Sequence, residues 1–268
     1  MKKDMKLNAN RFKGFADIYD NARPECPQKI KEILLNYLNR TLSLVVDIGC
    51  GTGLSTVIWS EVSSNVIGVE PSEDMIKLAR EKSVGLSNVE FISAFSNNTG
   101  IQDNSADIVT CSQAFHWMNP ESTINEVARI LKPGGIFATY DCDWPPVCNF
   151  EAELEYEKLF QKVSEIEAEH SSLKNGFEKW DKDKHLSNIK NSNKFRFTRE
   201  VVFLNRENCD AERFINIALS QGGLQAIIKE EIAELDPFLE TFKERIVEIF
   251  GASTFEIDFC YRMRIGIK

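Results

Sequence analysis

The chain has 268 residues, 43% of them hydrophobic, which is enough apolar content to bury a full core. Acidic residues outnumber basic ones by 41 to 32, and the resulting net charge of −9 disfavours a nucleic acid as partner. The sequence contains no apolar run near the ~20 residues that span a bilayer, and residues 1–10 are basic without the apolar core of a secretory signal, so we expect a cytoplasmic protein with no membrane partner.

Cysteine and histidine usage argues against disulfides and against a metal centre. The seven cysteines are an odd number, are scattered, and form no C-x-x-C pair. Such usage is typical of reduced thiols in the cytoplasm. The three histidines, His116, His170 and His185, are not spaced as a ligand pair, so we expect no metal site.

The most informative segment joins a buried strand to a glycine-rich turn. After a helix predicted at 27–38, an apolar run at 43–48 predicts a strand covered on both faces, and Gly49, Gly51 and Gly53 follow it. Alternating glycines at a strand end permit tight turns and leave no Cβ in the way of a ligand. A helix predicted from about residue 54 to 61 would point its unpaired N–H groups into the same space. We interpret this junction as a ligand cradle.

A second strand, predicted at 65–69, ends in the carboxylate of Glu70. In doubly wound folds, an acid at this point binds the hydroxyls of a ribose. The cradle and the acid together predict nucleoside binding.

Strands and helices continue to alternate up to residue 140, which is the rhythm of a parallel doubly wound sheet. Residues 141–146 break this rhythm, because their paired prolines stop a strand and turn the chain away. The further elements expected before the break are helices at 73–82 and 121–131 and strands at 89–92, 107–112 and 135–140.

Beyond the break, residues 150–170 carry apolar side chains at near-helical spacing and predict a helical insert over the mouth of the sheet. The sheet is expected to resume at 195–204, and a final strand at 254–267 follows helices at about 211–220 and 232–250. We therefore divide the chain into a core with its N-terminal helix (1–143), a substrate-side helical insert (144–194), and C-terminal strands and helices that complete the core (195–268).

The glycine spacing indicates which nucleoside binds. A dinucleotide fingerprint reads Gly-x-Gly-x-x-Gly, whereas here Asp47 precedes three alternating glycines. An acid at this place would repel a diphosphate but suits an amino group. The pattern resembles motif I of the class I S-adenosylmethionine-dependent methyltransferases, and residues 70–75 are similar to the acidic loop and helix start that follow in that family.

The resemblance extends over about residues 12–141. Residues 103–109 are similar to the family's strand four and residues 130–137 to its helix-turn-strand five, while 15–24 and 113–117 are similar to segments of the trans-aconitate methyltransferase-like (methyltransferase domain 11) branch. The resemblance implies a doubly wound, Rossmann-like α/β fold with a seven-stranded, mostly parallel sheet and an antiparallel C-terminal edge hairpin. It also implies S-adenosyl-L-methionine as cofactor.

Roles for single residues follow from the resemblance. Asp47 would lie near the methionine amino group, directly or through water, Glu70 would accept both ribose hydroxyls, and Met75 would cover one adenine face. In a site without a ligand, the same three residues would be a helix cap, a solvated loop charge and a core side chain. The expected cofactor site also takes in Pro71, Ser72 and Gln113.

One position departs from the family pattern. Where the family often carries an acid that binds the adenine amine, counting back from Asp107 reaches Phe95 and Ser96. A phenyl ring cannot accept that hydrogen bond. We therefore expect adenine to be recognised by stacking and by the backbone N–H of Ser96.

Two N-terminal residues and one histidine complete the candidate site. Tyr19 and Arg23 lie four apart; in the related branch this region folds over the cofactor, where a guanidinium suits the methionine carboxylate and a ring face suits the sulfonium. A core ring and a surface turn residue are the alternatives. His116 is the one histidine in a motif and is our candidate general base, the alternative being a structural histidine held by Trp117 and backbone.

These features together predict a methyltransferase that acts on a small-molecule acceptor by in-line transfer, with proximity and desolvation supplying most of the rate. A carboxylic acid is one acceptor considered, and the sequence does not identify it further. The alternatives are an S-adenosylmethionine-binding protein without catalysis and a nicotinamide-dependent oxidoreductase. The apolar pattern singles out no interface, which leaves the oligomeric state open.

Overall fold

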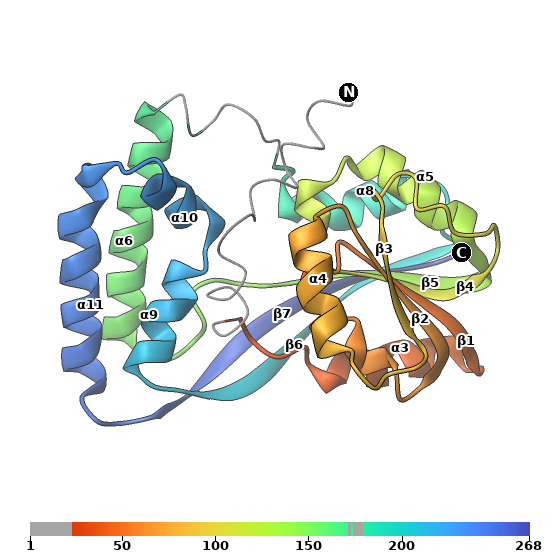
Figure 1. Cartoon of the computed structure of the whole chain (residues 1–268), viewed down its shortest axis with the longest axis horizontal. Helices are drawn as coiled ribbons and strands as arrows, with labels where there is room; N and C mark the ends of the chain where they lie inside the picture. Colours follow the sequence, from red (N-terminus) through yellow and green to blue (C-terminus); the bar gives the residue numbers. More distant parts are fainter. Residues whose placement is uncertain (1–22, 171–172, 174–178) are drawn as a thin grey trace.

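Figure 1 shows the computed structural model of the chain, which describes residues 23–170, 173 and 179–268. Its centre is a seven-stranded sheet with the order β3-β2-β1-β4-β5-β7-β6. The five neighbouring strands β3, β2, β1, β4 and β5 run parallel to one another, and β7 is antiparallel to both β5 and β6. The predicted fold class is thereby confirmed. The strands are β1 (Leu42–Ile48), β2 (Ser63–Glu70), β3 (Val89–Ser93), β4 (Ala106–Ser112), β5 (Leu131–Cys142), β6 (Phe197–Cys209) and β7 (Phe255–Ile267).

The described helices form two groups. One group lies around the sheet and consists of α3 (Gln28–Leu38), α4 (Glu73–Lys82), α5 (Pro120–Ile130) and α8 (His185–Asn191). The other group, which we call the helical lobe, lies at the far end of the long β6–β7 hairpin (Figure 1). The helical lobe consists of α6 (Phe150–Glu169), α9 (Ala211–Leu219), α10 (Gly222–Lys229) and α11 (Asp236–Phe250).

The central strand β1 is buried on both faces, which explains its uninterrupted apolar run. Val45, Val46 and Ile48 are at most 1% exposed. From β1 the chain winds outward through β2 and β3, and from the neighbouring β4 it winds outward the other way through β5. Such a reversal leaves a crevice outside the carboxyl ends of the two strands. The residues that follow Ile48 and Ser112 therefore face a natural binding site.

A single hydrophobic cluster joins the sheet to the helical lobe. It includes Leu34 on α3, Val45 on β1, Tyr140 on β5, and Phe214 and Phe250 in the helical lobe. Within the helical lobe, α6 packs against α10 and α11, which come from the third segment of the predicted division. The second and third segments thus pack together in the helical lobe. The boundaries proposed at 143 and 194 remain a prediction.

The structure corrects the expectation of a helix at 54–61. These residues form successive turns with a single short 3₁₀ helix at Val57–Trp59. The hydroxyls of Ser55 and Thr56 both donate to the Asp47 carboxylate, and such local side-chain bonds compete with a regular helix. No α-helix therefore begins directly after the glycine-rich turn, and the row of unpaired N–H groups that we expected from its first turn is not present at this place.

Other differences are smaller. β5 begins at Leu131, where the preceding helix was expected to end, and extends to Cys142. The helix α10 was not predicted, and the helix expected from 232 is a 3₁₀ turn at Ala233–Leu235 followed by α11. Among the residues that the structure describes, no helix is both long and apolar enough to cross a membrane.

Candidate active site

Two neighbouring hollows lie at the carboxyl ends of the central strands. The first, which we call the loop hollow, has a volume of about 70 Å³ and is lined by the turn after β1, including Gly49, Gly51 and Ser55. The second, the acceptor hollow, has a volume of about 520 Å³ and lies between His116 and the helical lobe. Arg23 and Gln113 line both, so the two hollows meet at these residues.

The turn after β1 needs glycine for two different reasons. Gly49 adopts φ +71°, and a Cβ there would clash with the side chains of Met118 and Ala114. Gly51 adopts φ +54°, but a Cβ there would meet no atom within 4 Å. Gly49 therefore permits close packing of the protein on itself, whereas Gly51 leaves open space. Such a space is what a ligand needs in order to approach the backbone.

Asp47 holds this turn from inside. Its carboxylate accepts hydrogen bonds from the hydroxyls of Ser55, Thr56 and Thr110 at 2.7, 2.8 and 2.8 Å. The residue is fully buried, and burial raises the pKa of Asp47 despite these three donors. Asp47 does not line the loop hollow, but Ser55 does. Asp47 therefore affects the loop hollow indirectly, because its hydrogen bonds fix the conformation of the turn that lines the hollow.

Glu70 ties the end of β2 to the same turn. One carboxylate oxygen accepts from the backbone N–H of Gly51 at 3.2 Å, and the other accepts from that of Ser72 at 3.0 Å. Burial raises the pKa of Glu70 to about 7, although these two N–H groups act in the opposite direction. The strand-end acid predicted from the sequence is thus placed directly beside Gly51.

The residues expected near an adenine lie farther along the sheet and do not line the loop hollow. Met75 is buried on α4 at 3% exposed, and Ser96 is 9% exposed with its hydroxyl 2.8 Å from that of Thr123. Phe95 and Pro71 are partly exposed. In this conformation Phe95, Pro71 and Ser72 offer more surface to a ligand than Met75 does.

Arg23 is fixed at the junction of the two hollows. Its guanidinium lies 5.0 Å from the centre of the Trp144 ring, and its Nη2 donates to the carbonyl of Ser220 at 3.1 Å. Gln113, directly after β4, holds a left-handed backbone conformation at φ +51° and donates from its side-chain amide to Cys142. Tyr19 lies outside the described residues.

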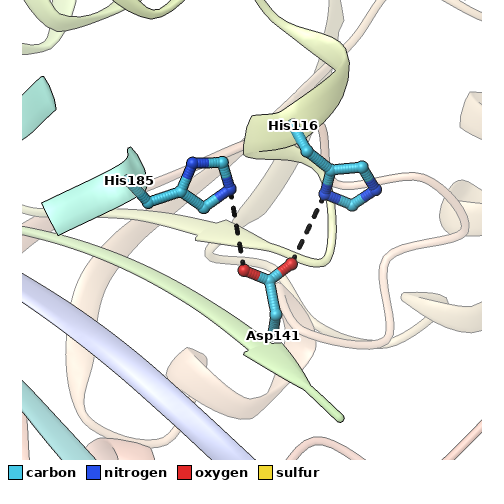
Figure 2. Close-up of side chains that lie close together, drawn as sticks. All are labelled: His116, Asp141 and His185. Carbon is cyan, nitrogen blue, oxygen red and sulfur yellow. Dashed lines mark ion pairs between the residues drawn. The ribbon is translucent and has the colours of Figure 1, made fainter. Parts of the chain in front are cut away.

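His116 belongs to a buried charged cluster centred on Asp141 (Figure 2). The Nδ1 atom of His116 lies 3.4 Å from one carboxylate oxygen of Asp141, and the Nε2 atom of His185 lies 3.8 Å from the other. Lys182 and Arg264 add positive charge, with nitrogens 3.2 and 3.0 Å from the same carboxylate. In Figure 2 the Nε2 atom of His116 lies on the side of the ring away from Asp141. His116 itself lines the acceptor hollow.

The cluster fixes a charge pattern that suits proton transfer. Burial lowers the pKa of His116 to about 4, against the attraction of the Asp141 carboxylate. Burial alone would raise the pKa of Asp141, but His116 and Lys182 hold it below its usual range. At neutral pH, a neutral imidazole therefore faces an ionised carboxylate. An Nδ1–H directed at Asp141 would leave the Nε2 lone pair free to accept a proton.

The segment that contains the turn after β1 and His116 matches a known family. Residues 46–139 match the model of the methyltransferase domain family. A candidate S-adenosylmethionine-dependent methyltransferase of Saccharomyces cerevisiae, CRG1, is 31% identical over 140 residues. Residues 46–139 thus carry a methyltransferase domain, similar in sequence to S-adenosylmethionine-dependent enzymes. The cofactor of such a domain is S-adenosylmethionine, and assignment to the trans-aconitate methyltransferase-like branch remains a prediction.

The likeness to other methyltransferases covers part of each sequence and nearly all of the fold. The yeast match spans 51% of this chain and 48% of the relative, and an uncharacterized methyltransferase of Mycobacterium tuberculosis is 33% identical over 50% of this chain and 51% of its own length. The chain thus spans about half the length of these relatives. A solved candidate type II methyltransferase from Anaeromyxobacter dehalogenans superimposes with a TM-score of 0.67 at 19% identity, covering 91% of this chain and 97% of its own. At that identity it shows the fold alone.

Three residues at the turn after β1 and beside it have the chemical groups that S-adenosylmethionine would need. Gly51 lines the loop hollow with open space beside its Cα, and the Glu70 carboxylate, which accepts from the Gly51 N–H, offers the kind of acceptor that ribose hydroxyls need. Arg23 lines the same hollow, and its guanidinium would neutralise a carboxylate bound there. The donor set is thus suited to a zwitterionic nucleoside.

The Asp141 cluster also has the spacing that a metal ion would require, because ligand atoms of His116, Asp141 and His185 lie within 4.8 Å of one another. Its charges argue otherwise. Lys182 and Arg264 already contact the only carboxylate of the trio, and a divalent cation beside Asp141 would be repelled by both. The charges around the cluster thus disfavour a metal ion at this place.

Sequence reasoning missed Asp141, although a usable signal was present. Asp141 lies near the end of β5, as Asp47 and Glu70 lie near the ends of β1 and β2. The same rule that found the first two acids applies to the third. Lys182 and Arg264 carry no local signal, because they reach Asp141 only through the folded chain. Arg213, on α9 of the helical lobe, pairs with Glu207.

Proposed function

We propose that the protein transfers a methyl group from S-adenosylmethionine, bound at the loop hollow, to a small molecule in the acceptor hollow. The observation that carries this proposal is the shared lining of the two hollows by Arg23 and Gln113. Transfer requires the methyl carbon and the acceptor atom to meet in line, and a common wall between two sites provides such a meeting point. The turn after β1, which buried Asp47 braces from inside, lines the loop hollow beside that wall.

In this proposal the cofactor is held by residues from five segments. Gly49, Gly51 and Gly53 bring the backbone close, while Glu70 accepts the ribose hydroxyls and keeps its bonds to the turn. Arg23 neutralises the methionine carboxylate. Asp47 supports the amino group through the hydroxyl of Ser55, since its own oxygens are enclosed. Phe95 stacks on the adenine, with Pro71, Ser72, Met75, Ser96 and Gln113 completing the proposed site.

The acceptor hollow favours a small molecule that has both an apolar part and an anionic part. Its volume of about 520 Å³ lies in the range of small-ligand pockets. Aromatic walls come from Trp117, Trp144 and Phe160. Lys179 and Lys182 also line it and would attract an anion. A carboxylic acid is therefore one suitable acceptor.

His116 supplies a proton acceptor where the acceptor atom carries a proton. The bound cofactor supplies an electrophilic methyl group on a positively charged sulfur. Transfer of that methyl group to an oxygen or nitrogen of the acceptor would neutralise the sulfur and leave the acceptor with a proton to lose. The proton of the acceptor passes to Nε2 of His116, and Asp141 balances the imidazolium that results. A carboxylate acceptor carries no proton, so for that class proximity and desolvation act alone.

The direct test combines binding with turnover. Calorimetry should show that S-adenosylhomocysteine binds the full chain, and incubation with methyl-labelled S-adenosylmethionine and a panel of small acids, phenols and amines should label at least one acceptor. Binding without labelling of any acceptor would favour the alternative of a non-catalytic cofactor-binding protein. Binding of NADH in place of S-adenosylhomocysteine would favour the oxidoreductase alternative. A cytoplasmic location is proposed with the same function, in keeping with the seven free cysteines.

A further inference from the structure

β6 forms one outer edge of the sheet and is unusually open. All of its 13 residues pair with β7 on the inner side, and no strand among the described residues pairs with its outer side. Figure 1 shows β6 running along the margin of the sheet as far as the helical lobe. Val202 and Leu204 on this strand are 59% and 56% exposed. A long edge strand with exposed apolar side chains is a template for pairing with another chain.

The hydrogen bonds of β7 show which backbone groups of β6 point outward. Asp258 exchanges both of its backbone bonds with Val147, at 2.9 and 2.8 Å, on the side away from β6. Its cross-strand neighbour Arg206 is therefore at a non-hydrogen-bonded position of the β6–β7 ladder. The N–H and C=O of Arg206 point outward, and alternation gives the same direction to Glu200, Val202 and Leu204.

We infer that a second copy of this chain pairs with this edge, antiparallel, about a two-fold axis at Phe203. Glu200 of each chain then faces Arg206 of the other, Val202 faces Leu204, and Arg199 faces Glu207. Each pair occurs twice because of the symmetry, so the interface contains four pairs of opposite charge and no pair of like charge. The outward-pointing backbone groups fall opposite one another in this register, as an antiparallel ladder requires.

The charge pattern selects this register over its neighbours. Moving the axis to residue 202 places Glu200 opposite Leu204 and Arg206 opposite Thr198. Moving it to residue 204 places Glu200 opposite Asn208 and Arg206 opposite Val202. Neither alternative forms an opposite-charge pair from these residues, and opposite-charge cross-strand pairs are a recognised source of sheet stability.

The same charges are already part of cross-strand pairs within one chain. Arg206 donates to both oxygens of Asp258 at 2.9 Å, and Glu200 accepts from Arg264 at 2.8 Å. Across the joined sheets the order becomes Asp258, Arg206, Glu200, Arg264, with alternating sign at every step. Pairing of two copies therefore adds a partner to each charge without removing one. A self-complementary edge of this kind favours an identical chain over an unrelated peptide.

Mass measurement of the full chain by light scattering tests the inference. We expect a species of twice the 30.5 kDa chain mass. Val202→Pro removes an N–H that points outward and leaves the ladder to β7 intact, so it should weaken the dimer roughly tenfold or more through the loss of two symmetry-related hydrogen bonds. Val202→Thr, which keeps the N–H and the branched side chain, is the matched control and should dimerise as the wild type does.

A mixing experiment tests the register. Arg206→Glu and Glu200→Arg should each be monomeric, because each faces a like charge in its own copy, and an equimolar mixture should recover the dimer. The readout is mass, with circular dichroism to verify that each variant is folded. A wild-type chain that remains monomeric up to ~100 µM, equal dimerisation of the two Val202 variants, or a mixture that stays monomeric would each overturn the inference.

Discussion

Asp141 lies 3.4 Å from His116 and shares its carboxylate with Lys182 and Arg264, so one buried acid connects the candidate base to two fixed positive charges. The arrangement separates two roles. His116 faces the acceptor hollow, while Asp141 stays behind it and sets its orientation. In the proposed function Asp141 is therefore a positioning residue and His116 the candidate catalytic one.

The pH dependence of turnover tests the state of His116. Because its pKa is lowered to about 4, the imidazole stays neutral well below the usual histidine range, and the rate with a protic acceptor should be nearly constant between about pH 5 and about pH 8. A histidine with an ordinary pKa would lose most of its rate by about pH 5. Initial rates measured across this range decide between the two.

His116→Gln should lower kcat roughly 100-fold for a hydroxyl or amine acceptor and leave a carboxylate acceptor nearly unaffected. His170→Gln is the matched control, since His170 is a partly exposed histidine paired with Glu234. An undiminished rate for His116→Gln with a protic acceptor would remove the base assignment.

Asp141→Asn should destabilise the fold by about 3 kcal/mol, because Lys182 and Arg264 lose their common counter-charge. The pKa of Asp141 is held below its unfolded value, so its stabilisation is complete above that value and is lost as pH falls. The difference between wild type and variant in denaturant unfolding should therefore shrink from about pH 5 downward. Asp143→Asn, in an exposed pair with Arg262, should cost less than about 0.5 kcal/mol.

Glu70→Gln should change cofactor binding and pH dependence together. The pKa of Glu70 is raised to about 7, so ionisation opposes the apo fold and stability should fall as pH rises from about 4.5 to about 7. The glutamine variant should lose this slope in thermal melts and bind S-adenosylhomocysteine roughly 10- to 100-fold more weakly. Glu73→Gln, an exposed neighbour in the first turn of α4, should alter neither property.

The variant Gly51→Ala, compared with Gly85→Ala, distinguishes the cost of backbone strain from the loss of space for a ligand. Gly51 and Gly85 both have positive φ, and a Cβ at either would meet no atom within 4 Å. Both alanine variants should therefore lose a similar stability of about 1 kcal/mol in unfolding experiments. Only Gly51→Ala should also lose calorimetric binding of S-adenosylhomocysteine. Equal affinities for the two variants would show that the open space at Gly51 is not part of the cofactor site.

The sequence predicted the strands of the sheet because burial on both faces leaves a direct trace. Val45, Val46 and Ile48 form an apolar run that no amphipathic helix or exposed strand would carry. The helix expected at 54–61 was wrong for a reason that this segment alone does not show. Ser55 and Thr56 bond to Asp47, and that interaction depends on the fold of the preceding strand.

Candidate site residues were predictable when they followed strand ends and were not when they arrived from distant segments. Asp47 and Glu70 follow the first rule, and their contacts at the turn after β1 are those of neighbouring parallel strands. Arg264 meets Asp141 across 123 positions of the chain, in a register that only the β5–β7 pairing defines. Periodicity within one segment carries no information about such a contact.

The β6–β7 hairpin belongs both to the sheet and to the helical lobe, since its strands pair from end to end and lead into α9 and out of α11. No peptide linker separates the two halves at this point. Deleting the helices would leave the hairpin without its apolar cover, and loosening the sheet would release the helices. Thermal denaturation of the described residues should therefore proceed as one cooperative transition, and the helical lobe should not fold when it is transferred to another protein.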